Sequence, residues 1–281
     1  MRKSVTLKDG KAYNFDNMKI MGILNATPNS FFEGSRVSSV DVAVETALKM
    51  IEDGADILDI GGESTRPGSE PVDVDEEISR VVPLIEAIRE VNKEVIISID
   101  TYRAKTAEAA ILAGADIVND ISGLTFDENM ADVVAKYNVP VFIMHIKGTP
   151  KDMQNNPHYD DVILEMSQFF EERINYALSK GISRDKIMLD PGIGFGKNYQ
   201  HNVDIIKNIE TFYKFDMPIL LAASRKGMIG YALGDLPAEE RLEGTMAITC
   251  YAADRGIEMI RVHDVKENYR AARMTEVFRN E

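Results

Sequence analysis

Apolar and polar positions along the chain repeat in a regular unit: an amphipathic helix, a glycine, a short apolar strand and a polar cluster. In one such unit Val44 and Ile51 fall on the same face of a predicted helix, which ends at Gly54. Residues 57–60 then read as a buried strand, and residues 61–66 as a polar loop. Because helical and strand patterns alternate in this way, the sequence predicts an α/β fold with parallel strands.

The same pattern predicts eight strands. They lie near residues 19–24, 56–60, 95–99, 116–118, 140–143, 187–189, 218–221 and 258–261. Helical patterns separate them, including an alanine-rich one over residues 104–113, and the last helix ends near Phe278. Eight βα units in 281 residues are typical of a (β/α)8 TIM barrel. The alternative, an open doubly wound sheet, rarely needs so many regular cycles.

The amino terminus departs from this rhythm. Asp9-Gly10 separates two short segments within residues 5–15, which predicts a β-hairpin in residues 1–17, ahead of the barrel. No linker, low-complexity tract or second domain is evident elsewhere in the sequence. We therefore expect residues 1–281 to form a single domain.

Composition narrows the classes of function. The chain has 32 basic and 46 acidic residues, a formal net charge of −14, which argues against nucleic acid or an anionic membrane as a partner. An anionic ligand must then be held by a few local cations. The sequence lacks a signal-like apolar segment or membrane span, and its one cysteine, Cys250, excludes an internal disulfide, so we expect a cytoplasmic protein. Cys250 shares a helical face with Leu242 and Met246 and is expected to pack in the core.

Polar side chains follow the predicted strands at their carboxyl ends, where barrel enzymes form their active sites. One set mixes carboxylate, amide and ammonium groups, which suits a planar heterocycle with alternating donors and acceptors: Asp100, Asn119, Asp190 and Lys226. A second set is neutral polar or cationic and suits a phosphate or pyrophosphate: Asn25, Thr65, Arg66, Arg261 and His263. We expect these side chains to converge, although they are spread over most of the chain.

Residues 189–197 place Asp190 where an apolar strand ends and three glycines follow. A dinucleotide-binding fingerprint would need glycine where Lys197 stands, and a phosphate-binding P-loop would need glycine where Pro191 stands. Both glycine-loop interpretations fail, so we interpret Asp190 as an acid presented to a small ligand.

Asp120 and Asp264 also follow predicted strands, but each can equally be a helix cap. No residue spacing indicates a structural zinc site, which leaves Mg²⁺ held partly by substrate phosphates.

Taken together, the motifs resemble those of the dihydropteroate synthase family, in the family's order and over nearly the whole chain. The matching segments are residues 21–31, 61–68, 100–101, 119–121, 144–145, 190–197, 224–226 and 261–264. The resemblance implies condensation of 6-hydroxymethyl-7,8-dihydropterin pyrophosphate with 4-aminobenzoate, which yields 7,8-dihydropteroate and pyrophosphate in folate biosynthesis. It further implies a dissociative, Mg²⁺-assisted displacement, a homodimer formed through late helices, and a target of sulfonamides.

The resemblance also implies a role for each matching residue. The pterin-binding positions correspond to Asp100, Asn119, Met144, Asp190, Phe195, Lys226 and Arg261. The pyrophosphate positions correspond to Asn25, Thr65, Arg66 and His263, and Asn25 also matches the metal position. The 4-aminobenzoate pocket corresponds to Phe31, Pro67 and Gly227. We expect Glu33, Lys226 and Asp100 to act in catalysis, with Glu33 stabilising the cation formed as pyrophosphate leaves.

The chain departs from the family pattern at three positions. Asn29 stands where the family commonly has Asp, Glu33 replaces the acid of an Asp-Gly pair, and Gly227 replaces a serine. Loss of that hydroxyl near the aminobenzoate carboxylate removes a donor worth about 1–2 kcal/mol, which predicts weaker binding of aminobenzoate and sulfonamides.

These departures motivate an alternative function, a pterin-binding paralogue without synthase activity. A third interpretation is a pterin-barrel methyltransferase that passes a methyl group to a corrinoid. That enzyme would share Asp100, Asn119 and Asp190 but would not need Arg66 or residues 224–226. Because the chain keeps these anion-binding residues, we favour the active synthase.

Overall fold

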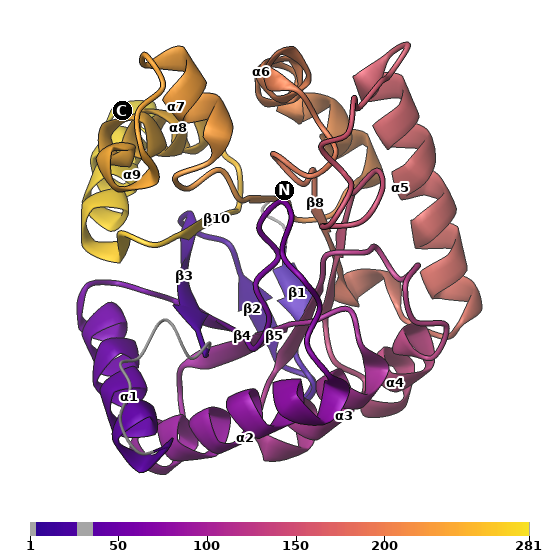
Figure 1. Ribbon diagram of the computed structural model, residues 1–281, viewed down its shortest axis with the longest axis vertical. Helices are drawn as coiled ribbons and strands as arrows, with labels where there is room; N and C mark the ends of the chain where they lie inside the picture. Colours follow the sequence, from indigo (N-terminus) through magenta and orange to yellow (C-terminus); the bar gives the residue numbers. More distant parts are fainter. Residues whose placement is uncertain (1–3, 27–35, 281) are drawn as a thin grey trace.

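Eight parallel strands close into a barrel in the computed structural model, which describes residues 4–26 and 36–280 (Figure 1). The barrel strands are β3 (Lys19–Asn25), β4 (Ile57–Gly61), β5 (Ile96–Asp100), β6 (Ile117–Asp120), β7 (Val141–Met144), β8 (Ile187–Asp190), β9 (Leu220–Leu221) and β10 (Met259–Val262). They pair in the order β8-β7-β6-β5-β4-β3-β10-β9, and a bridge between Leu189 and Ile219 joins the two ends. The predicted (β/α)8 barrel and its eight strands are confirmed.

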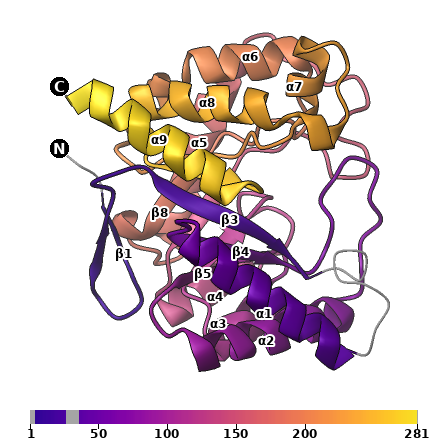
Figure 2. The ribbon, with the colours of Figure 1, turned by 90° about the vertical axis from the view of Figure 1, so that its left-hand side faces the viewer.

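Helices surround the barrel and cover the outer face of its strands (Figures 1 and 2). They are α1 (Arg36–Glu52), α2 (Val74–Val91), α3 (Ala104–Ala113), α4 (Met130–Tyr137), α5 (Val162–Ser179), α6 (Tyr199–Lys207), α7 (Gly227–Ala232), α8 (Leu242–Asp254) and α9 (Val265–Asn280). Short 3₁₀ helices cover Arg184–Lys186, Ile209–Phe215 and Ala238–Glu240. Within the described ranges, no helix has both the length and the apolar character needed to span a membrane.

Helix α2 shows why these segments fold as they do. Asp73 caps its amino terminus by accepting a hydrogen bond from Asp75 N, and acidic residues in the first turn complement the helix dipole. Val81, Leu84 and Ile88 recur at helical spacing, are buried and face the barrel. The polar and apolar pattern thus determines both where this helix begins and which side it buries.

Strand β9 is shorter than the segment predicted over residues 218–221. Pro218 has no N–H and cannot donate to a neighbouring strand, although its carbonyl oxygen accepts from Leu189 N at 2.9 Å. The N–H of Ile219 is bound by the Glu258 carboxylate at 2.9 Å. Regular pairing therefore begins only at Leu220.

The prediction that Cys250 packs in the core is wrong. Helix α8 buries its threonine and alanine face, where Thr249 donates to Asn268 Oδ1 of α9 at 2.6 Å. Leu242, Met246 and Cys250 lie on a face that is only half-buried. A polar contact between two helices has overridden the apolar pattern, and the apolar stripe is left partly exposed.

The predicted N-terminal hairpin is present and covers the end of the barrel where the strands begin (Figure 2). It consists of β1 (Ser4–Thr6) and β2 (Ala12–Asn14), which pair antiparallel. Val5 and Phe15 pack on apolar side chains from the barrel strands, namely Met21, Ile57, Ile117, Phe142, Met188, Leu220 and Met259. Lys186 Nζ fastens the hairpin by donating to Thr6 O at 2.9 Å. This end is filled by side chains, so the opposite end is left for a ligand.

Candidate active site

The predicted polar residues meet at the carboxyl ends of the strands. In the strand ladders Asn25 is in register with Gly61, Gly61 with Asp100, and Asp100 with Asn119. Asp190 is likewise the last residue of β8 and is paired with Met144. Since paired residues of parallel strands point the same way, these side chains share one end of the barrel. The predicted convergence of the strand ends is thus present in the fold.

Arg261 forms the centre of a buried charged cluster. Its Nη2 donates to Asp100 Oδ2 at 2.6 Å, and its Nε donates to Asp59 Oδ2 at 2.5 Å. Burial raises the pKa of Asp100 to about 7; Arg261 opposes this rise and Asp59 adds to it. Burial disfavours the charged form of Arg261, but the two carboxylates raise its pKa above the usual value. The guanidinium is therefore a permanent cation shared by two acids.

Hydrogen-bond acceptors around this cluster have no protein partner. Among the described residues, the unpartnered buried atoms include Asp59 Oδ1, Asp100 Oδ1, Asn119 Oδ1 and Ser98 Oγ. Buried polar atoms are rarely left unpaired, because each costs about 1–3 kcal/mol. Asp100 Oδ1 and Asn119 Oδ1 lie at the barrel mouth and are suited to a ligand whose ring presents N–H donors. Asp59 and Ser98 are paired two residues deeper in β4 and β5.

Asp190 begins the loop that lies next to this cluster. Its Oδ1 accepts from Gly192 N at 2.7 Å, and burial raises its pKa to about 6, against the attraction of that N–H and of Lys226. Gly192 has φ +65°, and a Cβ there would lie 2.1 Å from His145 O. Only glycine permits this approach to the end of β7. The glycines therefore shape the loop, while the acid stays available to a ligand.

Lys197 holds the same loop from inside. It is buried, and its Nζ donates to three carbonyl oxygens, those of His145 at 3.1 Å, Gly192 at 2.9 Å and Phe195 at 2.8 Å. Three acceptors satisfy the three N–H donors of an ammonium group. Lys197 thus links the end of β7 to the loop that carries Asp190.

Lys226, Phe195 and Met144 form one wall of the site. The Nζ of Lys226 lies 4.2 Å from the centre of the Phe195 ring, a cation–π contact. Phe195 and Met144 belong to a small apolar cluster with Ile121, Ile146 and Met153. Burial and the charge of Arg261 lower the pKa of Lys226 to about 8, so it still carries a proton at neutral pH.

His263 lies beside several cations. Burial and the charges of Arg261, Arg225 and Arg66 lower its pKa to about 4, so the ring is neutral at pH 7. Ser224 Oγ accepts from His263 N at 3.2 Å and lies 2.9 Å from His263 Nδ1. Ser224 thus fixes the orientation of the ring. In the tautomer with its proton on Nε2, in which the Ser224 hydroxyl donates to Nδ1, the ring offers an N–H donor to an anion.

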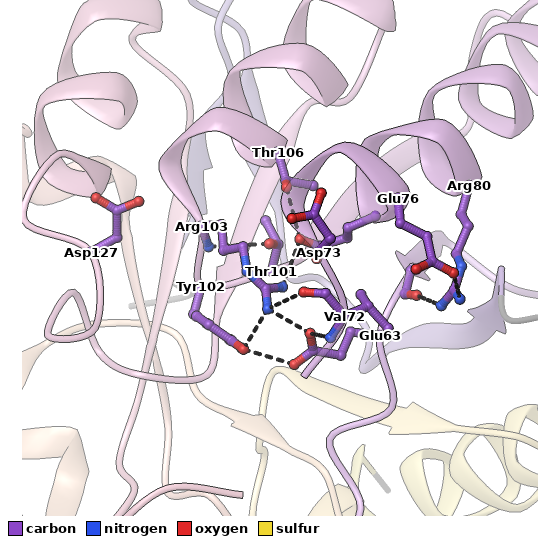
Figure 3. Close-up of polar contacts among 12 residues, drawn as sticks. Glu63, Val72, Asp73, Glu76, Arg80, Thr101, Tyr102, Arg103, Thr106 and Asp127 are labelled. Atoms are coloured by element: carbon purple, nitrogen blue, oxygen red, sulfur yellow. Dashed lines mark hydrogen bonds and ion pairs between the residues drawn. The ribbon is translucent and has the colours of Figure 1, made fainter. Parts of the chain in front are cut away.

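The loop after β4 is fastened at its base and exposed at its tip. Arg103 donates to Glu63 Oε2 at 2.7 Å, to Glu77 Oε2 at 2.9 Å and to Val72 O at 2.9 Å, and Tyr102 donates to Glu63 Oε1 at 2.8 Å (Figure 3). These contacts tie the base of the loop to the residues that follow Asp100. At the tip, Thr65 is half-buried, whereas Arg66 and Pro67 are exposed.

The remaining predicted residues fall into two groups. Phe31 and Glu33, together with Asn29, lie outside the described residues. Asn25 ends β3 at the barrel mouth, and no group of three or more His, Cys, Asp or Glu side chains in the described residues could hold a metal. A single amide oxygen fits a Mg²⁺ ion whose other ligands are substrate phosphates and water. A side chain at Gly227 would have open space, since nothing lies within 4 Å of its Cβ position.

Two residues of this site are not among those predicted from the sequence, Asp59 and Lys197. Asp59 lies within an apolar strand, where a carboxylate is itself a signal of a buried polar function. Lys197 follows the glycine loop, and nothing in the local pattern predicts its contacts with the end of β7. Arg225 and Asp264 form a bidentate ion pair, with N–O distances of 3.0 and 2.6 Å, so Asp264 holds the residue before Lys226. Asp120 does cap a local turn, accepting from Ser122 N and Leu124 N.

The chain is similar in sequence and in fold to proteins of known function. A family profile described as pterin binding enzyme matches residues 21–263. The dihydropteroate synthase of Clostridium beijerinckii is 50% identical over 259 residues, which cover 92% of this chain and 93% of that protein. The crystal structure of Yersinia pestis dihydropteroate synthase with a sulfonamide drug complex has a TM-score of 0.92 and 38% identity, and covers 100% of both chains. The Clostridium difficile dihydropteroate synthase, crystallised in the presence of pteroic acid, has a TM-score of 0.88 and 43% identity over 95% of this chain and 98% of that chain.

Proposed function

The chain belongs to the dihydropteroate synthase family of pterin-binding enzymes, and from this premise we propose how its residues divide the work of the reaction. The protein is a transferase of folate biosynthesis that condenses 6-hydroxymethyl-7,8-dihydropterin pyrophosphate with 4-aminobenzoate. The observation that best supports the division is the cluster of buried, unpartnered acceptors around Arg261, with further cations at its edge.

The pterin ring is bound by the acceptors at the strand ends. The carboxylate of Asp190 accepts from the amino-imine edge of the ring, and Asp100 and Asn119 accept further ring N–H groups. Lys226 donates to a ring acceptor, and Met144 and Phe195 contact the apolar faces. Because these side chains are held by strands, they orient the ring before the reaction begins.

The displacement is dissociative. The C–O bond to pyrophosphate breaks first, and the pyrophosphate leaves with the electron pair. Arg66, Arg261, Thr65 and His263 stabilise the leaving anion, as preplaced donors and cations do in such reactions. The cation left on the pterin is stabilised by Glu33 and by Asp100, and the aniline nitrogen of 4-aminobenzoate then forms the new C–N bond and loses a proton.

Mg²⁺ is proposed as the cofactor, with Asn25 as its protein ligand. The half-exposed amide of Asn25 at the barrel mouth suits an ion that arrives with the pyrophosphate. When bound, the metal would neutralise charge on the phosphate oxygens. Chelation with EDTA is expected to abolish pyrophosphate release while leaving the affinity for 6-hydroxymethylpterin unchanged.

The 4-aminobenzoate pocket is proposed to include Phe31, Pro67 and Gly227. The solved relatives with a sulfonamide complex and with pteroic acid support a pocket for an aromatic acid beside the pterin. We therefore propose that this chain also binds sulfonamides, with the weaker affinity expected from Gly227.

A homodimer is proposed through α7, α8 and α9, which lie side by side (Figures 1 and 2). Tyr231 (65%), Leu233 (49%) and Phe278 (69%) are exposed on or directly after α7 and on α9, and Met246 and Cys250 of α8 are half-buried. Exposed apolar side chains on these helices would suit a second copy of this chain. Sedimentation equilibrium is expected to give twice the mass of one chain. The location of the protein in the cytoplasm stays a prediction.

The activity is tested by incubating the protein with the pterin pyrophosphate, 4-aminobenzoate and Mg²⁺ and measuring pyrophosphate release. We expect release that depends on both substrates and on Mg²⁺. Tight binding of the pterin without any release would instead support a binding paralogue and overturn the proposal.

A further inference from the structure

We propose that Asp59 is a positioning residue with two roles. It fixes the orientation of the Asn119 amide, so that Asn119 presents an acceptor to the ligand ring. It also fixes the guanidinium of Arg261. The inference rests on the proposed pterin site and adds to it the residue that sets its hydrogen-bonding pattern. Asp59 stands in the middle of β4, and its side chain is 0% exposed. It therefore lies beneath the groups that face the ligand.

The geometry of the Asp59 carboxylate carries the inference. Its Oδ2 accepts from Asn119 Nδ2 at 3.1 Å and from Arg261 Nε at 2.5 Å. An ionised carboxylate beside a guanidinium can only accept hydrogen bonds. The side of the Asn119 amide that faces Asp59 must therefore be its NH₂ group, and the opposite side, Oδ1, is turned to the ligand.

The consequence is a site whose ring contacts are dominated by acceptors. Asn119 Oδ1 and Asp100 Oδ1 are buried and have no hydrogen-bond partner among the described residues. With its amide reversed, Asn119 would offer a donor and would suit a ring that carries an oxo group in place of an amino group. Asp59 thus adds, through Asn119, to the preference for a 2-amino over a 2-oxo heterocycle that Asp190 also provides, without touching the ring.

Arg261 is held by the same atom. Its Nε is bound to Asp59 and its Nη2 to Asp100, so two carboxylates fix the plane of the guanidinium. Without Asp59, Arg261 would keep its contact to Asp100 of β5 but lose the second carboxylate. The guanidinium of Arg261 would then be displaced, and the side-chain amide of Asn119 could rotate freely.

The test compares two ligands in matched variants. The affinities of 6-hydroxymethylpterin and of its 2-oxo analogue, 6-hydroxymethyllumazine, are measured by calorimetry for the unaltered protein, Asp59→Asn and Asp120→Asn. We expect Asp59→Asn to weaken pterin binding by about 10- to 100-fold and to reduce the preference for pterin over lumazine by about tenfold or more. An amide at position 59 can donate or accept, so it no longer dictates the orientation of Asn119.

Asp120→Asn is the control for losing a buried carboxylate. Asp120 is also 0% exposed and follows Asn119 directly, but it bonds only to backbone N–H groups of the turn that it caps. We expect this variant to lower the melting temperature and to leave the pterin-to-lumazine preference within twofold of the unaltered protein. A purely structural role for Asp59 would give the same result as this control and would overturn the inference.

Two further outcomes separate the inference from the proposed function. If the unaltered protein fails to bind 6-hydroxymethylpterin, the pterin site itself falls, and the inference falls with it. If the unaltered protein binds and Asp59→Asn keeps the full preference, only the inference is overturned.

A measurement on the unaltered protein covers the case in which Asp59→Asn does not fold. Neutron diffraction from perdeuterated crystals shows the deuterons on Asn119 Nδ2 directly. We expect one of them to point at Asp59 Oδ2. An amide oxygen of Asn119 facing Asp59 would contradict the inference.

Discussion

The barrel rim and the loop after β4 contribute to the same site in opposite ways. At the rim, Asn119 and Asp190 are buried at the ends of their strands, and their positions are fixed by the sheet. In the loop, Arg66 and Pro67 are exposed. Arg103 holds the base of the loop through Glu63, and at the tip Gly68 N donates to Pro150 O, in the loop after β7, at 3.0 Å. The difference indicates that the proposed pterin site, with Arg261 and His263, is built into the rigid fold. The proposed contacts of Thr65 and Arg66 to the leaving anion lie instead on a loop that can adjust as substrates bind.

The largest effect is expected where the two regions are joined. Replacing Arg103 by Met leaves Glu63 and Glu77 without their buried cation, which we expect to cost about 3–5 kcal/mol of unfolding free energy. Turnover should fall further than stability alone explains, because the loop loses its anchor. Urea unfolding and steady-state kinetics at a temperature where the variant is folded would measure both.

Arg89→Met is the matched control for this change. Arg89 also holds a carboxylate, Asp116, and the carbonyl oxygens of Val95 and Gly114, but it acts near the beginning of β5, away from the site. It should lose stability while its KM for the pterin pyrophosphate stays unchanged. Equal KM values in the two variants would show that Arg103 does not position the loop.

A large effect on the rim alone is expected from Asp190→Asn. The amide replaces one of the two carboxylate oxygens by a donor, which then faces a ring N–H and loses a charged hydrogen bond. We expect pterin affinity to fall by about 2–3 kcal/mol, measured by calorimetry with 6-hydroxymethylpterin. Unchanged affinity would place the amino-imine edge of the ring elsewhere.

Much of this comparison could be read from the sequence, because its signals are local. An apolar run followed by a polar residue marks each strand end, and Asp100, Asn119 and Asp190 lie at the carboxyl ends of their strands as the motifs predict. Contacts between distant segments left no such mark. The bond from Asp59 to Arg261 joins residues 202 positions apart, and the burial of Thr249 instead of Cys250 depends on Asn268 in the next helix.

Acid is expected to weaken pterin binding at the rim. Burial raises the pKa of Asp100 to about 7 and that of Asp190 to about 6, so both gain protons as the pH falls through this range. A protonated carboxyl offers an O–H where the ring needs an acceptor. If both acids must be ionised, proton linkage then predicts a loss of about 100-fold in affinity between pH 7.5 and 5.5. A flat pH profile would mean that neither acid must be ionised to hold the ring.

The same raised pKa values act in the opposite direction on the stability of the free protein. Between the ordinary Asp value near 4 and pH 7, the folded state binds more protons at Asp100 and Asp190 than the unfolded chain does. Their contribution to the unfolding free energy therefore falls as the pH rises through this window. As the pH rises through this window, pterin affinity increases while the contribution of Asp100 and Asp190 to the unfolding free energy decreases. This is expected of buried acids whose role is to bind a ligand.

A smaller effect is expected at the edge between the regions, from Gly227→Ser. The added side chain meets open space at the start of α7, so it should be accommodated without strain. A restored hydroxyl should strengthen binding of 4-aminobenzoate and of a sulfonamide by about 1–2 kcal/mol and leave pterin affinity unchanged. No change in either aromatic ligand would remove Gly227 from the pocket.

The division between a rigid pterin site and a loop that acts on the leaving group is tested most directly by Arg66→Ala. Arg66 is exposed on the loop, yet its charge reaches Lys226 and His263. The decisive measurement is the affinity of this variant for 6-hydroxymethylpterin, alongside its rate of pyrophosphate release. We predict an affinity within about twofold of the unaltered protein and a release rate lowered by about tenfold or more. Pterin affinity that falls in parallel with the rate would contradict the division.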